Sequence, residues 1–331
     1  MRRMLTGALL LLICFAALAI PSGAIPSAPE AKAAETTSIP STPAPTASPV
    51  PKPEPGEKPM EWYEPSEAPA PSPETIAADG TRILSATIAS DALMDNDTYY
   101  DIDPEALAAG GVDLTFPKEG YQILIVHTHG TEAYAQDPDD PYEECGEYHT
   151  TDPEYSVIRV GEELASALGE YGLNVLHCTT LFDYPSYNGS YVRCGEAIEE
   201  YLSAYTGIRM VIDLHRDAIG DDNTIYKTMA NIDGVYAAQL LFVMGSDVNL
   251  EHPDWKNNLA LALMLQQAAN IRYGTLMRPT NLCNYRYNQQ LTPGSLLLEV
   301  GASGNTLEEA LCAVRLFAET AGPILSAYVE E

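Results

Sequence analysis

Histidine and glutamate residues follow directly after an apolar run near the middle of the chain. The stretch ILIVHTHGTEAY, residues 123–134, passes from four apolar residues to His127 and His129, and Glu132 follows. A His-x-x-Glu pair supplies one nitrogen and one oxygen ligand of the kind that zinc binds. The spacing therefore indicates a metal site at the end of a strand, with His129 and Glu132 as candidate ligands. His127 could replace His129 as the ligand, or it could pack beneath the site.

Two later apolar runs also end in ionisable residues. The run IRMVIDLHRD, residues 208–217, carries Asp213 and His215, and SLLLEVG, residues 295–301, carries Glu299. Two histidines and a carboxylate fill three positions around a tetrahedral zinc ion and leave the fourth to water. We expect His215 to be the third ligand and Glu299 to be the base that accepts a proton from this water. Asp213 alternates with His215 along the strand, so it is expected to orient the imidazole.

Each of these signals is weak when it is taken alone. A single histidine at a strand end is more often a hydrogen-bonded structural residue than a ligand, and His-x-x-Glu occurs by chance in many proteins. Three polar strand ends in one fold are a stronger signal, because burying each ionisable group without a partner is costly. The combination favours a metal site over three unrelated structural residues.

Other catalytic chemistries find no support in the sequence. There is no G-x-S-x-G turn and no glycine-rich phosphate loop. The five cysteines after Cys14 are scattered without CxxC spacing, and their odd number argues against a pure disulfide framework. The net charge of -30 argues against nucleic acid as a partner, because phosphate backbones require basic surfaces.

Strands and helices alternate along the second half of the chain. Strands are expected over residues 121–129, 173–179, 208–217 and 294–301, and helices over 154–172, 190–205, 254–274 and 306–325. Residues 226–232 and 235–245 are expected to form a hairpin or two neighbouring strands. This order predicts an α/β fold with a mostly parallel or mixed sheet flanked by helices. Ligands of such sheets bind outside the carboxyl ends of the strands, where the candidate residues fall.

Three segments of different composition divide the chain. Two arginines precede an uncharged apolar run in residues 1–24, which predicts a signal-anchor that crosses the membrane once. Residues 25–80 are rich in proline, alanine and serine and predict an extended linker. Residues 81–331 are expected to form the catalytic domain. The positive amino terminus should stay inside, which predicts an extracytoplasmic domain held at the cell membrane.

Four motifs in a fixed order resemble a known family. HTHGTEAY, VIDLHRDA, YRYNQQL and SLLLEVG are similar to motifs of the stage II sporulation protein P family of cell-wall hydrolases in endospore-forming bacteria. The resemblance covers residues 123–301, and the anchor and linker match the layout of that family. It implies a zinc-dependent N-acetylmuramoyl-L-alanine amidase that acts on peptidoglycan during engulfment of the forespore. It also implies cleavage of cross-links between stem peptides, with the stage II sporulation proteins D and M as partners.

The resemblance also assigns roles to single residues. The histidine of the first motif becomes His129 or His127, and the histidine of the DLHRD motif becomes His215. The glutamate of the last motif becomes Glu299. Ordinary zinc amidases take a ligand from a glutamate at the start of the first helix, which would be Glu154; we favour Glu132 because it lies within the motif. Arg216 could bind a substrate carboxylate or stabilise an oxyanion, or it could form a structural pair with Asp217. Asn288 and Gln289 could bind sugar or peptide amides.

Two other functions are compatible with these residues. The chain could be a membrane-tethered scaffold that binds peptidoglycan or a partner protein without catalysis. It could also be a carboxypeptidase-like metallopeptidase, which would use the same His-x-x-Glu and histidine chemistry on a different amide. Glu299 favours an enzyme, because a structural metal site needs no additional carboxylate base.

Overall fold

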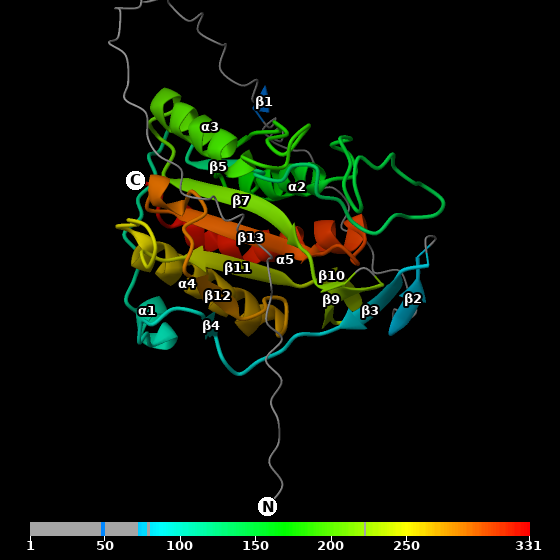
Figure 1. Ribbon diagram of the computed structural model, residues 1–331. Coiled ribbons are helices and arrows are strands. Elements are labelled where there is room, and N and C mark those ends of the chain that lie inside the picture. Colours follow the sequence, from blue (N-terminus) through cyan, green and yellow to red (C-terminus); the bar gives the residue numbers. More distant parts are fainter. Residues whose placement is uncertain (1–47, 50–71, 78–79, 222) are drawn as a thin grey trace, which may run out of the picture. The chain divides into compact units, whose positions relative to one another are not determined.

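An eight-stranded mixed sheet is the main feature of the computed structural model, which describes residues 48–49, 72–77, 80–221 and 223–331 (Figure 1). Its strands lie in the order β1-β6-β5-β7-β13-β11-β12-β4. Their bounds are β1 Ser48–Pro49, β4 Met94–Asn96, β5 Ile123–Val126, β6 Val175–His177, β7 Met210–Asp217, β11 Leu240–Gly245, β12 Thr280–Cys283 and β13 Ser295–Ala302. Figure 1 shows β7, β13 and β11 side by side in the middle of the sheet.

The strand directions divide this sheet into two groups. Strands β6, β5, β7 and β13 run parallel to one another, whereas β11 runs antiparallel to β13. Strands β12 and β4 are parallel to β11. The carboxyl ends of β5, β7 and β13 therefore meet at one edge of the sheet, as the expected parallel arrangement requires. The α/β fold with a mixed sheet is confirmed.

Helices cover both faces of the large sheet. Their bounds are α1 Pro104–Ala109, α2 Val157–Gly169, α3 Ser190–Ala204, α4 Trp255–Tyr273 and α5 Leu307–Ser326, with a short 3₁₀ helix η1 at Gln289–Leu291. One apolar cluster joins α2, α4 and α5 to the sheet through Met210, Ile212 and Leu214 of β7. Another joins α3 to Val211 on the opposite face of the same strand. Asp213 and His215 follow the alternation of Val211 and therefore lie on the α3 face.

Local signals explain where two of these helices begin and where one ends. The Ser156 side chain accepts a hydrogen bond from the Ile158 backbone N–H at the start of α2, and Thr306 forms a capping box with Glu309 at the start of α5. Helix α4 ends at Gly274, whose φ of 65° favours glycine. Helices were expected at all of these positions, and the structure places each within a few residues of the expected bounds.

A second, five-stranded sheet was not expected from the sequence. It consists of β2 Glu74–Ile76, β3 Arg82–Ala86, β8 Gly220–Asp221, β9 Thr224–Ile232 and β10 Val235–Ala238, of which β8 pairs only with β9. Strands β9 and β10 form the expected hairpin through Asp233 and Gly234, both of which have positive φ. The expected strand 235–245 is divided at Gln239, whose side-chain amide donates to the carbonyls of Ile88 and Thr275. The two halves of that run therefore belong to different sheets.

The amino-terminal expectations fall largely outside the described residues. The expected anchor, residues 1–24, lies entirely outside them. Strands β1 and β2 lie within the range 25–80 that was expected to be linker, and β2 pairs with β3. Among the residues that the structure describes, no helix has the length and apolar character needed to cross a membrane.

Candidate metal and active site

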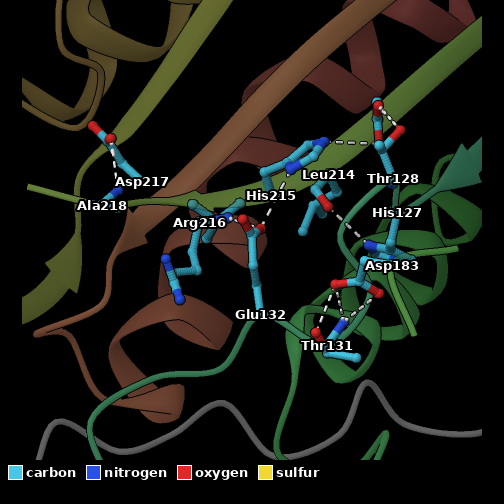
Figure 2. A network of polar contacts seen from close by, with 12 residues as sticks. His127, Thr128, Thr131, Glu132, Asp183, Leu214, His215, Arg216, Asp217 and Ala218 are labelled. Atoms are coloured by element: carbon cyan, nitrogen blue, oxygen red, sulfur yellow. Dashed lines mark hydrogen bonds and ion pairs between the residues drawn. The ribbon is translucent and has the colours of Figure 1, made fainter. Parts of the chain in front are cut away.

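His215 lies between two buried carboxylates on the α3 face of the sheet (Figure 2). Its Nε2 atom is 3.0 Å from Asp213 Oδ1, and its Nδ1 atom is 3.3 Å from Glu132 Oε2. Asp213 belongs to the same strand as His215, whereas Glu132 comes from the turn after β5. The parallel pairing of β5 with β7 therefore brings together two motifs that are more than 80 residues apart.

The turn that carries Glu132 is held at several points. The Glu132 backbone N–H donates to the His129 carbonyl over 3.1 Å, and Glu132 Oε2 accepts from the Arg216 backbone N–H over 3.1 Å. Between the two candidate ligands, Thr131 donates from its backbone N–H and its hydroxyl to the carboxylate of Asp183. These contacts aim the Glu132 carboxylate at His215, as Figure 2 shows.

His129 lies next to this pair. Its ring centroid is 5.3 Å from that of His215, and the two rings are nearly perpendicular. Its Nδ1 atom is buried and has no hydrogen-bond partner among the described residues. Burial lowers the pKa of His129, which favours the neutral imidazole that binds metals.

Glu299 of β13 lies opposite His215 in the register of the two strands. Its Oε2 atom is buried without a partner in the described part of the chain. Burial and the negative charge of Asp217 raise the pKa of Glu299 to about 8, against the opposing effect of His215. A strongly shifted carboxyl group beside a histidine–carboxylate cluster is typical of functional sites.

The charges of the central cluster favour a cation between the carboxylates. Burial by itself would lower the pKa of His215, but Asp213 and Glu132 outweigh it and raise that pKa well above the usual value. Burial would raise the pKa of Glu132, yet His215 outweighs it and lowers that pKa to about 2. The protein residues alone therefore hold a proton between two carboxylates, at a position that a metal cation would compete for.

The residues present fit zinc in their chemistry and in one spacing. Two ligands of a tetrahedral zinc ion lie roughly 3.3–3.6 Å apart, given bond lengths of about 2.0–2.2 Å. The 3.3 Å between His215 Nδ1 and Glu132 Oε2 matches that separation, and His129 Nδ1 is an additional free nitrogen nearby. Across the described residues, no group of three or more His, Cys, Asp or Glu side chains already converges on one metal position.

The two alternative ligands lie elsewhere. His127 turns away from the cluster, because its Nδ1 atom is 2.9 Å from the Leu214 carbonyl and its Nε2 atom is 2.8 Å from His177 Nε2. Burial lowers the pKa of both histidines, to about 4 for His127 and about 3 for His177. Glu154 is exposed before the start of α2. His127 therefore packs beneath the site, which is one of its two expected positions.

Arg216 binds backbone carbonyls rather than Asp217. Its guanidinium group donates to the carbonyls of Ala133 and Tyr148, over 2.9 and 3.0 Å. Asp217 instead pairs with Arg278 over 2.8 Å. The alternative prediction, a structural pair of Arg216 with Asp217, is therefore wrong. The role of Arg216 toward substrate stays a prediction.

Sequence reasoning missed two groups that support the site. Asp183 was not singled out, although it follows β6 and so occupies the same kind of strand-end position as the other candidates. Thr128 was only noted as part of the motif, but its backbone N–H and hydroxyl both donate to Asp213, over 2.8 and 2.6 Å. Asp183 could have been found by considering the ionisable residues that follow every expected strand, including residues 173–179.

These features define an α/β protein with a buried histidine–carboxylate site on one face of a mixed sheet. A family model described as stage II sporulation protein P matches residues 60–321. The chain belongs to this family, as its motifs indicate. A curated relative, stage II sporulation protein P of Bacillus subtilis (strain 168), is 28% identical over 204 residues, which cover 56% of this chain and 47% of the relative. The chain thus spans about half the length of that relative.

Solved amidase structures give weaker similarity. The CwlD amidase from Clostridioides difficile, in complex with the GerS lipoprotein, aligns at 14% identity and a TM-score of 0.38, covering 63% of this chain and 98% of that one. The N-acetylmuramoyl-L-alanine amidase AmiC2 of Nostoc punctiforme aligns at 13% identity and a TM-score of 0.35, covering 63% and 96%. Scores this low support no conclusion about this chain.

Proposed function

We propose that this protein is a zinc-dependent peptidoglycan hydrolase that cleaves the amide between N-acetylmuramic acid and L-alanine. The observation that carries the proposal is the buried, unpartnered Oε2 atom of Glu299 beside the Glu132–His215 pair, within the part of the chain that is described. A structural metal site requires its ligands but no additional carboxylate. A hydrolase requires both, because a base must take a proton from the attacking water.

Each side chain of the site has a separate task in this proposal. Glu132, His215 and His129 would hold zinc, which when bound lowers the pKa of a water molecule to about 7 and polarises the scissile carbonyl. Glu299 accepts the proton of the attacking water and returns it to the leaving amine nitrogen of L-alanine. Asp213, 3.0 Å from Nε2 of His215, would keep the imidazole proton on Nε2 and so leave the Nδ1 lone pair for zinc.

The pKa of Glu299 suits this task. A general base works best when its pKa is near the working pH, since it must both hold and release a proton. The value of about 8 applies to the protein residues alone. A nearby cation would lower it and increase the ionised fraction near neutral pH.

We also propose the cellular setting that the family resemblance implies. Residues 1–24 would anchor the chain in the cell membrane, with the catalytic domain outside. The hydrolase would act in forespore engulfment with the stage II sporulation proteins D and M, and would also cut cross-links between stem peptides.

The test is mass spectrometry of products from purified peptidoglycan incubated with the full chain, with added zinc and with chelator. The proposal expects free stem peptides and peptide-free glycan with zinc and none with chelator. Cleaved peptides that remain attached to glycan would instead indicate a carboxypeptidase-like metallopeptidase. Undigested wall that still binds the protein would indicate the scaffold.

A further inference from the structure

A row of four tyrosines extends from the candidate metal site. The Tyr187 ring stacks on His129 at 4.5 Å with an interplanar angle of 8°, and Tyr191 meets the same imidazole edge-on at 5.4 Å. The ring centroid of Tyr287 is 5.7 Å from that of Tyr191, and the ring centroid of Tyr285 is 6.2 Å from that of Tyr287. We call these four residues the tyrosine row. Its two ends, Tyr187 and Tyr285, are each 62% exposed.

The exposed ring of Tyr187 belongs to a loop that is fixed by α3. Arg193 donates from Nε to the Phe182 carbonyl over 2.7 Å and from Nη1 to the Asn188 carbonyl over 3.1 Å. These two carbonyls bracket Tyr187. One face of the ring is covered by His129, and much of the rest of the side chain is open to solvent. A ligand that stacks on it would therefore meet a surface already in place, which lowers the entropy cost of binding.

The other end of the row is fixed in a similar way. The loop passes so close to β11 that a Cβ on Gly245 would lie 2.2 Å from the Tyr285 carbonyl oxygen. Gln289 Oε1 accepts from the Gly245 backbone N–H, and the Asn288 amide donates to the Tyr191 carbonyl, each over 2.8 Å. Asn288 and Gln289 therefore hold this loop in place, and their role in binding substrate stays a prediction.

The row leaves the site on the side away from its charged end. The Tyr285 backbone lies over Gly245 of β11. Gly245 is two residues beyond Val243, which pairs with Leu297 of β13, and Leu297 pairs in turn with Asp213 of β7. The ion pair of Asp217 with Arg278 lies in the opposite direction, two residues beyond His215. At about 3.3 Å per residue, Gly245 lies roughly 7 Å along the strand direction from the level of Asp213.

We propose that the tyrosine row is a subsite for the glycan strand, with sugar rings stacking on Tyr187 and Tyr285. This inference rests on the proposed function, since it names the part of the substrate that lies beside His129. The glycan of a peptide-bearing strand is uncharged, and each sugar ring has an apolar face of C–H groups that suits an aromatic ring carrying a polar hydroxyl. The stem peptide carries carboxylate and ammonium groups, which suit the charged end of the site better.

The test measures binding separately from hydrolysis. The probe is the hexamer of N-acetylglucosamine, which has the sugar rings without peptide or charge, and its binding to the full chain is measured by titration calorimetry. We expect Tyr285→Ala and Tyr187→Ala each to weaken binding by about tenfold, and Tyr285→Phe to retain it. Tyr99→Ala is the matched control, because Tyr99 is 74% exposed and lies outside the row; it should bind as the unchanged chain does.

Two results would overturn the inference. One is equal affinity of all variants for the hexamer, and the other is weakened binding of a free stem peptide by Tyr285→Ala without any effect on the hexamer. The thermal unfolding midpoint of each variant checks that the fold is intact. Hydrolysis of peptidoglycan with no tyrosine-dependent sugar binding would reject the subsite and leave the amidase proposal standing. Tyrosine-dependent sugar binding without hydrolysis would reject the amidase proposal instead.

Discussion

At the scale of single residues, Glu299 and His215 have different tasks although they lie opposite each other on neighbouring strands. His215 is engaged by two carboxylates, whereas Glu299 Oε2 has no partner in the described region. Glu299→Gln should therefore lower hydrolysis by roughly 10²–10⁴-fold, the usual contribution of a positioned acid–base group. Bound zinc, measured by atomic absorption, should remain at the level of the unchanged chain. Loss of zinc together with activity would show that Glu299 is a ligand rather than the base.

Asp213 is expected to act on the metal through His215. Thr128 and His215 together engage both oxygens of its carboxylate. Asp213→Asn should keep the shape but weaken the 3.0 Å ion pair that orients the imidazole, and the loss of such a partner typically lowers metal affinity by about 10–100-fold. Zinc titration against a competing chelator measures this directly, and excess zinc should restore most of the activity. Unchanged zinc affinity would contradict this positioning role.

At the scale of elements, helix α2 approaches the sheet closely over the buried histidine pair. A Cβ on Gly161 would lie 2.6 Å from His127 Cε1 and 2.8 Å from His177 Nε2, so only glycine fits there. Gly161→Ala should lower the free energy of unfolding by about 1–3 kcal/mol, as overpacked core positions do. Gly169→Ala, in the same helix with no described atom within 4 Å of its Cβ, is the control and should be neutral or slightly stabilising. Denaturant unfolding of both variants gives the comparison.

Helices α2 and α5 are joined by Glu163, which accepts from Arg315 over 2.6 Å and from Arg159 over 3.0 Å. Burial alone would raise the pKa of Glu163, but the two arginines outweigh it and lower that pKa. Because the folded-state pKa is lowered, the stabilisation is present above the unfolded-state value and is lost as the pH falls through the folded-state value. Glu163→Gln should therefore cost roughly 1–2 kcal/mol at pH 7. The difference from the unchanged chain should disappear in strongly acidic solution, and a difference that persists there would contradict the ion-pair explanation.

At the scale of the whole molecule, metal binding and folding are coupled through the site. The candidate ligands come from β7 and from the turn after β5, which only the folded sheet brings together. Zinc at 100 times its dissociation constant should therefore stabilise the chain by about 2.7 kcal/mol, because it binds the folded state alone. Thermal unfolding with zinc and with chelator measures the shift. Magnesium, which prefers oxygen ligands, is the matched control and should have little effect.

Much of the fold could be predicted because its elements carry local signals. Apolar runs marked β5, β7 and β13, apolar periodicity marked α2 and α5, and Gly274 marked the end of α4. The second sheet was missed because β2, β3 and β8 are short, and because β3 pairs with the distant strand β9, with Arg82 opposite Thr224. The reversal of β11 relative to β13 was also not predicted, since an apolar run has the same composition in either direction.

The sequence by itself determined which residues stand at the strand ends, because the alternation and termination of apolar runs are local properties. It also determined the strand face shared by Asp213 and His215, since side chains alternate with a period of two. Only the tertiary structure decided that Glu132 faces His215, that His127 packs against His177, and that Arg216 binds carbonyls. It also decided that Asp183 accepts hydrogen bonds from Thr131 and that Tyr187 and Tyr191 pack against His129. These contacts join residues from different elements, so they depend on strand order, register and loop path, which no local pattern encodes.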